Sequence, residues 1–401
     1  MKSRSVKLLL LSAKCSLAAL LLLWVLSQVH WHDWVRDRGG RTYTLRRVTP
    51  SHVDVATGWL WWRSETSLPL AQIESVPLAS AGATFAHDGL ASSLRHVRHS
   101  LPLVGLAVLV TLVSYFLTAL RWRALLGLQD IRIGPWEALR LTFLGMFFNI
   151  VVPGTVGGDL VKAYYAARHA QAKGSVLVSV IIDRALGLLM LTILAGVMLG
   201  VLALASPGAT TDLRQAGLAV GVIAAVVTVG MLVLFSGRLR RFLHLQKLTQ
   251  RLPIANKLRA MGQAIRTYRS HPGGLALAAG ASLVSQALWI TGLALLGASL
   301  GLTQVRWYEY FLYIPLIYTI GAIPLTPGGI GFLEKLFLVF FVTADPSQVL
   351  ALALLARLLP ILLSLPGLVV AVTGAKLPPR EVMAAQLGSD ALEAPADPSI
   401  L

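Results

Sequence analysis

Long apolar stretches recur along almost the whole chain, and no other feature restricts the possible folds as strongly. An α-helix needs about 20 predominantly apolar residues to cross the hydrocarbon core of a bilayer. Hydrophobic residues make up 56% of the 401 positions and charged residues only 13%, which is more apolar surface than a soluble core could cover. The sequence therefore predicts an all-α polytopic membrane protein, with spans at 8–26, 101–120, 176–205, 216–235, 275–302 and 349–373.

Basic residues dominate the charge, and their positions predict the orientation. The formal net charge is +17, but Lys and Arg cluster at the ends of apolar segments instead of over one globular face. This pattern is typical of segments held on the cytoplasmic side of a membrane, so no nucleic-acid partner is expected. Lys2, Arg4 and Lys7 place the N-terminus inside. The basic connection 237–272 is also predicted to be cytoplasmic, as amphipathic helices on the inner leaflet or as a solvated loop.

Two shorter apolar stretches, 136–152 and 307–341, do not have the pattern of simple spans. Basic residues flank the first at both ends, so it is predicted to enter the membrane from the cytoplasmic side and turn back. The same alternation of sides predicts that the second enters from the outside and returns there. The two stretches would then form inverted repeats with two re-entrant helical hairpins of opposite topology.

The predicted turns of these hairpins share a sequence motif. The pattern P-x-T-x-G-G occurs at 153–158 and again 171 positions later at 324–329, and each copy is followed within about 30 residues by an arginine inside a span. Proline ends the incoming half-helix, the glycines allow the turn, and threonine can return a hydroxyl to the freed backbone groups. Unwound backbone at membrane depth is tolerated only beside protein or a watery cavity, so the two turns are expected to meet at a buried polar site.

Rare ionisable residues mark the same region. Arg184 and Arg357 are predicted near the middle of their spans, where an arginine costs several kcal/mol unless it faces a cavity or a partner. Asp159, Asp183 and Glu334 are the candidate partners, although Asp183 and Arg184 are adjacent and should point to different sides of their helix. Guanidinium groups and half-helix N-termini suit phosphate, which favours a phosphate-bearing lipid headgroup. The alternative, that these charges only lock helices together, remains open.

The predicted substrate-binding set consists of the polar, charged and glycine residues around the two turns. Lys162 belongs to it as a guide for the headgroup, but it reads equally well as an anchor whose ammonium reaches the membrane surface. No metal or cofactor site is predicted, because His30 and His32, like His96 and His99, lack further ligands nearby. The set is Asn149, Thr155, Gly157, Gly158, Asp159, Lys162, Asp183, Arg184, Thr326, Gly328, Gly329, Glu334 and Arg357.

The remaining parts complete a division into 1–27, 28–100, 101–374 and 375–401. The first part is predicted to be an uncleaved transmembrane helix rather than a signal peptide, because no small-residue cleavage site follows it. In the insert 28–100, alternating segments at 42–48 and 52–60 predict a small extracytoplasmic β-meander. Its Trp59, Trp61 and Trp62 suit packing of that sheet or the headgroup layer. The tail is predicted to be disordered and cytoplasmic.

These motifs resemble the transmembrane region of lysylphosphatidylglycerol synthases and the wider flippase-like family. The resemblance covers about 101–373, and the residues that carry it are Arg121-Trp122-Arg123, 149–159, Asp183-Arg184, 324–331 with Glu334, and Arg357. It implies a bacterial inner (plasma) membrane and lipid translocation between leaflets, or delivery of hopanoids or other lipids toward an outer membrane. Lys162 stands where the family leads us to expect an arginine. The soluble aminoacyl-transferase domain of the synthases is not expected here, because the chain ends about 28 residues after its last span.

Three functions are consistent with the sequence. The first is a lipid flippase in which the headgroup is held by Arg184, Arg357 and the half-helix ends, with membrane lipids as partners and no catalysis. The second is a membrane-embedded transferase acting on a lipid-linked substrate, for which the acidic residues near the membrane offer neither a DxD motif nor a histidine cluster. The third is an accessory subunit that contacts a partner lipid-synthesis enzyme through the insert.

Overall fold

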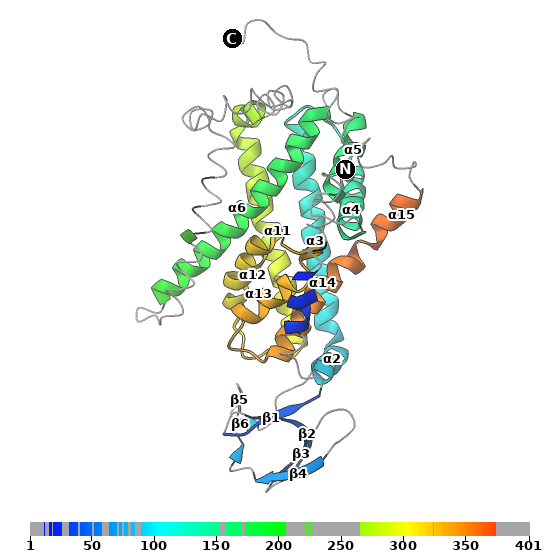
Figure 1. The fold of residues 1–401 in the computed structure, drawn as a ribbon. Coiled ribbons are helices and arrows are strands. Elements are labelled where there is room, and N and C mark those ends of the chain that lie inside the picture. Colours follow the sequence, from blue (N-terminus) through cyan, green and yellow to red (C-terminus); the bar gives the residue numbers. More distant parts are fainter. Residues whose placement is uncertain are drawn as a thin grey trace, which may run out of the picture. The chain divides into compact units, whose positions relative to one another are not determined.

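The structure is a computed structural model, and it is mostly helical with a small antiparallel sheet near the start of the chain (Figure 1). It describes parts of 12–25, 221–229 and 32–84, together with 90–151, 157–169, 173–205, 265–323 and 325–373. About half of the predicted span 8–26 lies outside the described residues, as do most of the predicted span 216–235, most of the connection 237–272 and the tail 375–401. The same holds for Trp59, Trp61, Trp62 and His30.

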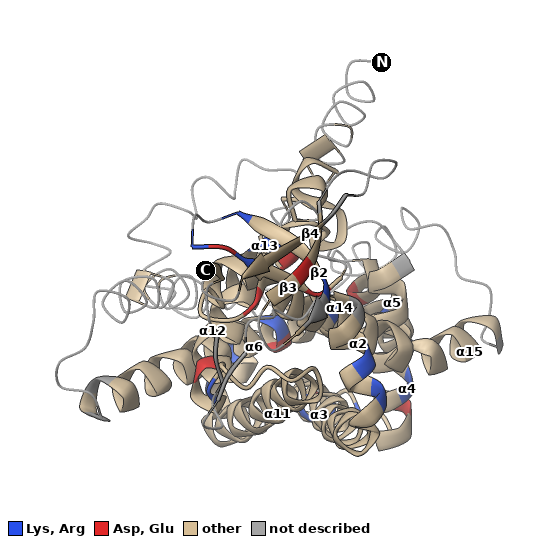
Figure 2. Ribbon diagram, turned by 90° about the horizontal axis from the view of Figure 1, so that it is seen from below, with Lys and Arg blue, Asp and Glu red and all other residues tan. Residues whose placement is uncertain are grey.

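Four described helices are long and apolar enough to cross a membrane. They are α3 (Leu101–Gly127), α6 (Lys173–Ala205), α11 (Pro272–Ser299) and α14 (Pro346–Leu363) with its continuation α15 (Leu365–Thr373). At about 1.5 Å per residue each reaches the roughly 30 Å of a hydrocarbon core. Figure 2 shows that charged residues are sparse on these helices. The structure thus confirms the four predicted spans that fall within the described residues.

The last of these spans is interrupted, whereas the sequence predicts it as continuous over 349–373. α14 ends at Leu363 and α15 begins at Leu365. Prolines at positions 360 and 366 lack the amide donors that a continuous helix would use there. The amide of Ser364 still donates to the carbonyl of Pro360 at 3.0 Å, as in a helix, but the amide of Gly367 donates to the carbonyl of Ser364, only three positions back, at 2.8 Å. After the break, α15 packs against α4 (Pro135–Val151).

The β-meander predicted for the insert is present. Strands β1 (Trp34–Arg36), β2 (Thr42–Val48), β3 (His52–Thr57) and β4 (Ser64–Pro69) pair in this order, each antiparallel to the next. Alternate residues of the strands meet in a small apolar cluster that contains Val35, Val53, Val55 and Ile73. The strand pair β5 (Val76–Leu78) and β6 (Gly82–Thr84) follows, and then helix α2 (Leu90–His99).

The chain divides into two compact units. Unit 1 consists of 1–109 and 290–358, and unit 2 of 110–289 and 359–401. Unit 1 contains the sheet, α2, α12 (Trp307–Gly321), the short helix η3 (Pro327–Gly329) and α13 (Phe332–Phe340). Unit 2 contains α4, α5 (Gly157–Ala166), η2 (Ala167–His169), α6 and α15. One copy of the repeated motif therefore lies in each unit.

Candidate functional site

The first motif joins α4 to α5, which lie side by side in unit 2 (Figure 1). Two glycines allow this close approach, because a Cβ added to Gly158 would collide with the carbonyl oxygen of Gly145. The amide of Gly158 donates to Asn149 Oδ1 at 2.9 Å. Asn149 thus closes the start of α5 by satisfying one of its free amides. Thr155 and the rest of the turn, 152–156, lie outside the described residues.

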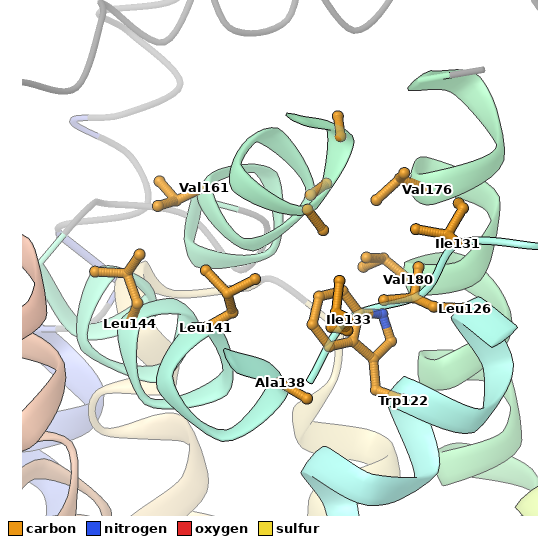
Figure 3. Packing of buried hydrophobic residues seen from close by; sticks show 13 residues of the cluster. Trp122, Leu126, Ile131, Ile133, Ala138, Leu141, Leu144, Val161, Val176 and Val180 are labelled. Carbon is orange, nitrogen blue, oxygen red and sulfur yellow. The ribbon is translucent and has the colours of Figure 1, made fainter. Parts of the chain in front are cut away.

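An apolar core fixes the position of this hairpin. Figure 3 shows Trp122 of α3 among aliphatic side chains from α4, α5 and α6, including Leu141, Val161 and Val180. The indole N–H of Trp122 donates to Ser179 Oγ at 3.3 Å, which sets the orientation of the ring. All thirteen residues of the cluster are buried. The charged residues described next are therefore held by a packed and well-defined scaffold.

Arg184 and Asp159 form a two-point ion pair between α6 and α5. The Nε and Nη2 atoms of Arg184 donate to the two carboxylate oxygens of Asp159 at 2.8 and 2.9 Å. The Arg184 side chain is 56% exposed and that of Asp159 only 15%. This parallel geometry is the strongest that a guanidinium and a carboxylate can adopt. It ties the residue immediately after the Gly157-Gly158 pair to the following long helix.

A second ion pair lies deeper in unit 2 and was not predicted. Arg121 Nε donates to Asp183 Oδ1 at 2.8 Å, and Arg121 Nη1 donates to Ser282 Oγ at 2.7 Å. Both charged side chains are nearly inaccessible, at 5% and 10% exposure. From the sequence, Arg121 was singled out only as one of the residues that carry the family resemblance. Its distance of 62 positions from Asp183 gave no sign of the contact.

Asp183 and Arg184 therefore pair with side chains of different helices, α3 and α5, in agreement with the prediction that these adjacent residues point to different sides of their helix. A buried tyrosine close to the Arg121 end of α3 completes this region: the Tyr268 hydroxyl donates to the Leu125 carbonyl at 2.9 Å. Burial raises the pKa of Tyr268 above its ordinary value, so this hydroxyl stays protonated and keeps its role as a donor.

Lys162 lies in the same part of unit 2 with a different kind of partner. Its Nζ sits 3.8 Å from the centre of the Trp122 ring, and the side chain is buried with 6% exposure. Contacts of this kind contribute about 2 kcal/mol or more when they are shielded from water. No carboxylate among the described residues lies within ion-pair distance of this ammonium, in contrast to both arginines.

The second motif joins α12 to α13 in unit 1. Gly328, Gly329 and Gly331 all have positive φ, at 61°, 69° and 75°. Side chains rarely adopt this conformation, which explains why the turn is rich in glycine. α12 and α13 have 15 and 9 residues, so at about 1.5 Å per residue neither is long enough to cross a bilayer. The second glycine turn thus lies between two short helices, and its re-entry into the membrane stays a prediction.

Arg357 of α14 holds this turn by three hydrogen bonds. Its Nε donates to Glu334 Oε1 at 2.7 Å, and its two terminal nitrogens donate to the carbonyls of Gly328 and Gly329 at 2.9 and 3.1 Å. Glu334 is 4% exposed and Arg357 26% exposed. We call this arrangement the Arg357 clasp. Both predicted arginines thus pair with acids that the sequence analysis named as candidates.

Two buried polar atoms beside the clasp lack hydrogen-bond partners within the part of the chain that the structure describes. They are Glu334 Oε2 and Thr326 Oγ1. Thr326 was expected to return its hydroxyl to the backbone of the turn, but the side chain makes no capping hydrogen bond to η3. Buried polar groups are seldom left unpaired, so the second turn is unusual in having two such atoms.

A comparison with protein families matches residues 76–367 to the lysylphosphatidylglycerol synthase transmembrane region. The matched stretch includes both motifs and every ion pair described for them, and it begins inside the insert at residue 76 instead of at the expected 101. No curated protein matches the chain. Among the described residues, no three His, Cys, Asp or Glu side chains gather closely enough to hold a metal ion. The match spans more than two thirds of the sequence, and the chain is therefore a multi-pass membrane protein of the lysylphosphatidylglycerol synthase transmembrane region family.

Proposed function

We propose that this protein moves a polar lipid, with phosphate in its headgroup, between the two leaflets of a bacterial inner membrane. In this proposal the N-terminus is cytoplasmic, and the two glycine turns enter the membrane from opposite sides as inverted, re-entrant hairpins. The headgroup passes along the residues around the turns, which remain our proposed substrate contacts. The sheet of the insert lies outside the cytoplasm. Membership of a membrane family linked by its name to a phospholipid synthase supports a lipid-related role.

The observation that carries the proposal is that both turns have the same kind of ion pair. At the first turn Arg184 pairs with Asp159, 25 positions before it, and at the second Arg357 pairs with Glu334, 23 positions before it. In each case the carboxylate follows the Gly-Gly pair and the arginine comes from the next long helix. Repeated elements with interrupted helices are typical of transporters that expose one site alternately to the two sides of a membrane.

The two pairs give each turn a polar surface that a bilayer would otherwise exclude. A charged group in the hydrocarbon region costs several kcal/mol, and it is tolerated where it is paired or faces water. Arg184 is paired and still 56% exposed, so one side of its guanidinium is open to a passing headgroup. This combination suits a path for a polar group better than a contact that only locks two helices together.

Lipid movement by the purified full-length chain tests the proposal. The protein is reconstituted into phosphatidylcholine vesicles with a trace of fluorescent phosphatidylglycerol, and dithionite then bleaches the label that reaches the outer leaflet. We expect faster loss of the protected fraction than in protein-free vesicles. Arg184→Ala and Arg357→Ala should abolish the acceleration, because each removes the charge that holds a turn.

A matched control is Arg140→Ala, since Arg140 is an exposed arginine on α4 that belongs to neither pair. This variant should move lipid as fast as the parent chain. The double variant Asp159→Asn with Arg184→Gln removes a pair without leaving a lone charge. Full activity in that double variant would show that the first pair is only a structural contact. A parent chain that does not accelerate lipid movement would overturn the proposed function. Altered lipid synthesis with an unchanged leaflet distribution would favour the transferase alternative.

A further inference from the structure

The charges around the first turn do not cancel. Four charged side chains act electrostatically on Lys162, and these four form the pairs Arg121–Asp183 and Arg184–Asp159. Lys162 is the fifth, and the described residues provide no carboxylate that contacts it. The flanking stretches 152–156 and 170–172 contain no acidic residue either. The region therefore carries a surplus of one positive charge, located on the Lys162 ammonium.

The surroundings of Lys162 suit a ligand better than a permanent internal partner. The side chain is buried with 6% exposure, and its aliphatic part runs past Gly145 before the ammonium reaches the face of Trp122. An ammonium has three N–H donors, and no described residue accepts a hydrogen bond from it. A ring face attracts the charge but offers no lone pairs, so the donors remain available.

The ring of Trp122 is held in a fixed orientation for its contact with Lys162. Its indole N–H is occupied by Ser179, and its ring is packed among the buried residues of the hairpin core (Figure 3). The ring cannot turn away without breaking these contacts, so the ammonium is held in one place. A fixed cation in a site with little water is the arrangement that binds an oxyanion tightly. The N-terminal end of α5 lies about one and a half turns earlier in the same helix, and its helix dipole favours negative charge as well.

We infer that Lys162, held over Trp122, is the binding site for the phosphate group of the lipid that the protein handles. The two arginines are less suited to this role than the sequence suggests, because each already donates to a carboxylate. The inference rests on the proposed function for the statement that the phosphate belongs to a lipid. A free phosphate ion has the same chemistry, and the experiment below separates the two sources.

Binding to the full-length chain in detergent tests this site. The probes are short-chain phosphatidylglycerol, inorganic phosphate, and the matching diacylglycerol, which has the same acyl chains but no phosphate. Lys162→Gln should bind phosphatidylglycerol roughly tenfold to hundredfold more weakly, as expected for the loss of a charged hydrogen bond. Lys162→Arg keeps the charge and should stay within a few-fold of the parent chain. Diacylglycerol should bind equally to all of them.

Lys335→Gln is the matched control, because Lys335 also lies over a tryptophan ring, 4.7 Å from the centre of Trp24, but in unit 1. It should bind phosphatidylglycerol like the parent chain. A second measurement needs no variant: phosphatidylglycerol should protect Lys162 from an amine-acylating reagent, as read by peptide mass spectrometry, and diacylglycerol should not.

Unchanged affinity of Lys162→Gln, or unprotected Lys162 in the presence of bound phosphatidylglycerol, would overturn the inference. Protection by inorganic phosphate but not by phosphatidylglycerol would overturn its lipid part. A parent chain that binds phosphatidylglycerol at Lys162 and yet moves no lipid in vesicles would overturn the proposed function and support the site. The two failures are therefore distinguishable.

Discussion

Arg121 and Arg184 are both paired with an aspartate in unit 2, but the protein buries the two pairs to different extents. The Arg121–Asp183 pair is 5% and 10% exposed, whereas Arg184 is 56% exposed. Breaking a buried pair leaves a charge without compensation, which costs about 3–5 kcal/mol. An exposed pair contributes about 1 kcal/mol or less. The first pair is thus suited to hold the fold, and the second to work at a surface.

This difference in burial predicts that glutamine at position 121 mainly lowers stability and that glutamine at position 184 mainly lowers lipid movement. Arg121→Gln should lower the apparent Tm of the detergent-solubilised protein by many degrees, because Asp183 remains buried without a partner. Arg184→Gln should lower it only slightly while removing lipid movement. Thermal unfolding followed by size-exclusion chromatography measures the first effect, and the vesicle assay the second. Equal losses of Tm in the two variants would contradict the assignment.

At the scale of single residues, the sequence indicated the charged side chains that lie in apolar segments. Arg184 and Arg357 lie inside apolar helices, where the cost of a charge makes a partner necessary, and the nearby acids Asp159 and Glu334 were the natural candidates. Arg121 lies near the end of its helix, where basic residues are common on the cytoplasmic side. The contact of Lys162 with Trp122, 40 positions away, depends on packing among α3, α4 and α5 that no local pattern reveals.

Among the elements, the α4–α5 hairpin depends on a glycine for its close packing. Gly158→Ala should separate the helices and destabilise the protein, because the new Cβ would collide with the Gly145 carbonyl and with Asn149. Gly196→Ala in α6 is the matched control, since a Cβ there meets nothing within 4 Å and alanine favours a helix by roughly 0.5–1 kcal/mol. Apparent Tm values should fall for the first variant and stay level or rise for the second.

The second turn depends on glycine for a different reason. A Cβ on Gly328 would meet nothing within 4 Å, but φ is 61°. Gly328→Val should therefore cost at least about 1–2 kcal/mol through backbone strain alone, and Gly328→Asn should cost less because asparagine tolerates this conformation. Thermal unfolding of both variants checks the order. A valine variant as stable as the parent chain would show that the turn does not keep this backbone conformation.

The helices and strands were largely predictable because their signals are local. Runs of apolar residues predicted the four described spans, strand alternation predicted β2 and β3, and Pro-x-Thr-x-Gly-Gly predicted the second turn. Most of the first turn lies outside the described residues. The break at Ser364 was missed because the surrounding residues are uniformly apolar, so hydropathy does not register it. Prolines 360 and 366 were the available signal. α14 continues through Pro360, so Pro366 is the signal that lies at the interruption, because proline lacks the amide donor of a continuous helix.

At the scale of the whole molecule, the proposed function depends on the predicted opposite orientation of the two hairpins. Single cysteines can test it in a Cys15→Ser background, since Cys15 is the only cysteine of the chain. Gly134→Cys lies before α4, and Thr303→Cys lies between α11 and α12; both positions are exposed. A membrane-impermeant maleimide should label Gly134→Cys only in inverted vesicles and Thr303→Cys only in intact cells. Labelling of both cysteines from the same side of the membrane would contradict the predicted inverted repeat.

The membrane class and the family were predictable because composition and two spaced motifs extend over most of the chain. Hydrophobic residues at 56% already exclude an ordinary soluble core. The family match confirms the resemblance and reaches further toward the N-terminus than expected, to residue 76, so it includes β5, β6 and α2. These elements were assigned to the insert because their polar composition differs from that of the spans.

The Arg357 clasp also bears on how transport could be driven. Coupled transporters often bind sodium ions through carbonyl oxygens of unwound backbone. Here the carbonyls of Gly328 and Gly329 already accept hydrogen bonds from a guanidinium. An alkali metal ion and the Arg357 side chain would have to compete for the same oxygens. If a sodium ion bound at this turn, the hydrogen bonds from Arg357 to the Gly328 and Gly329 carbonyls would have to break. Sodium binding would then release the turn from α14.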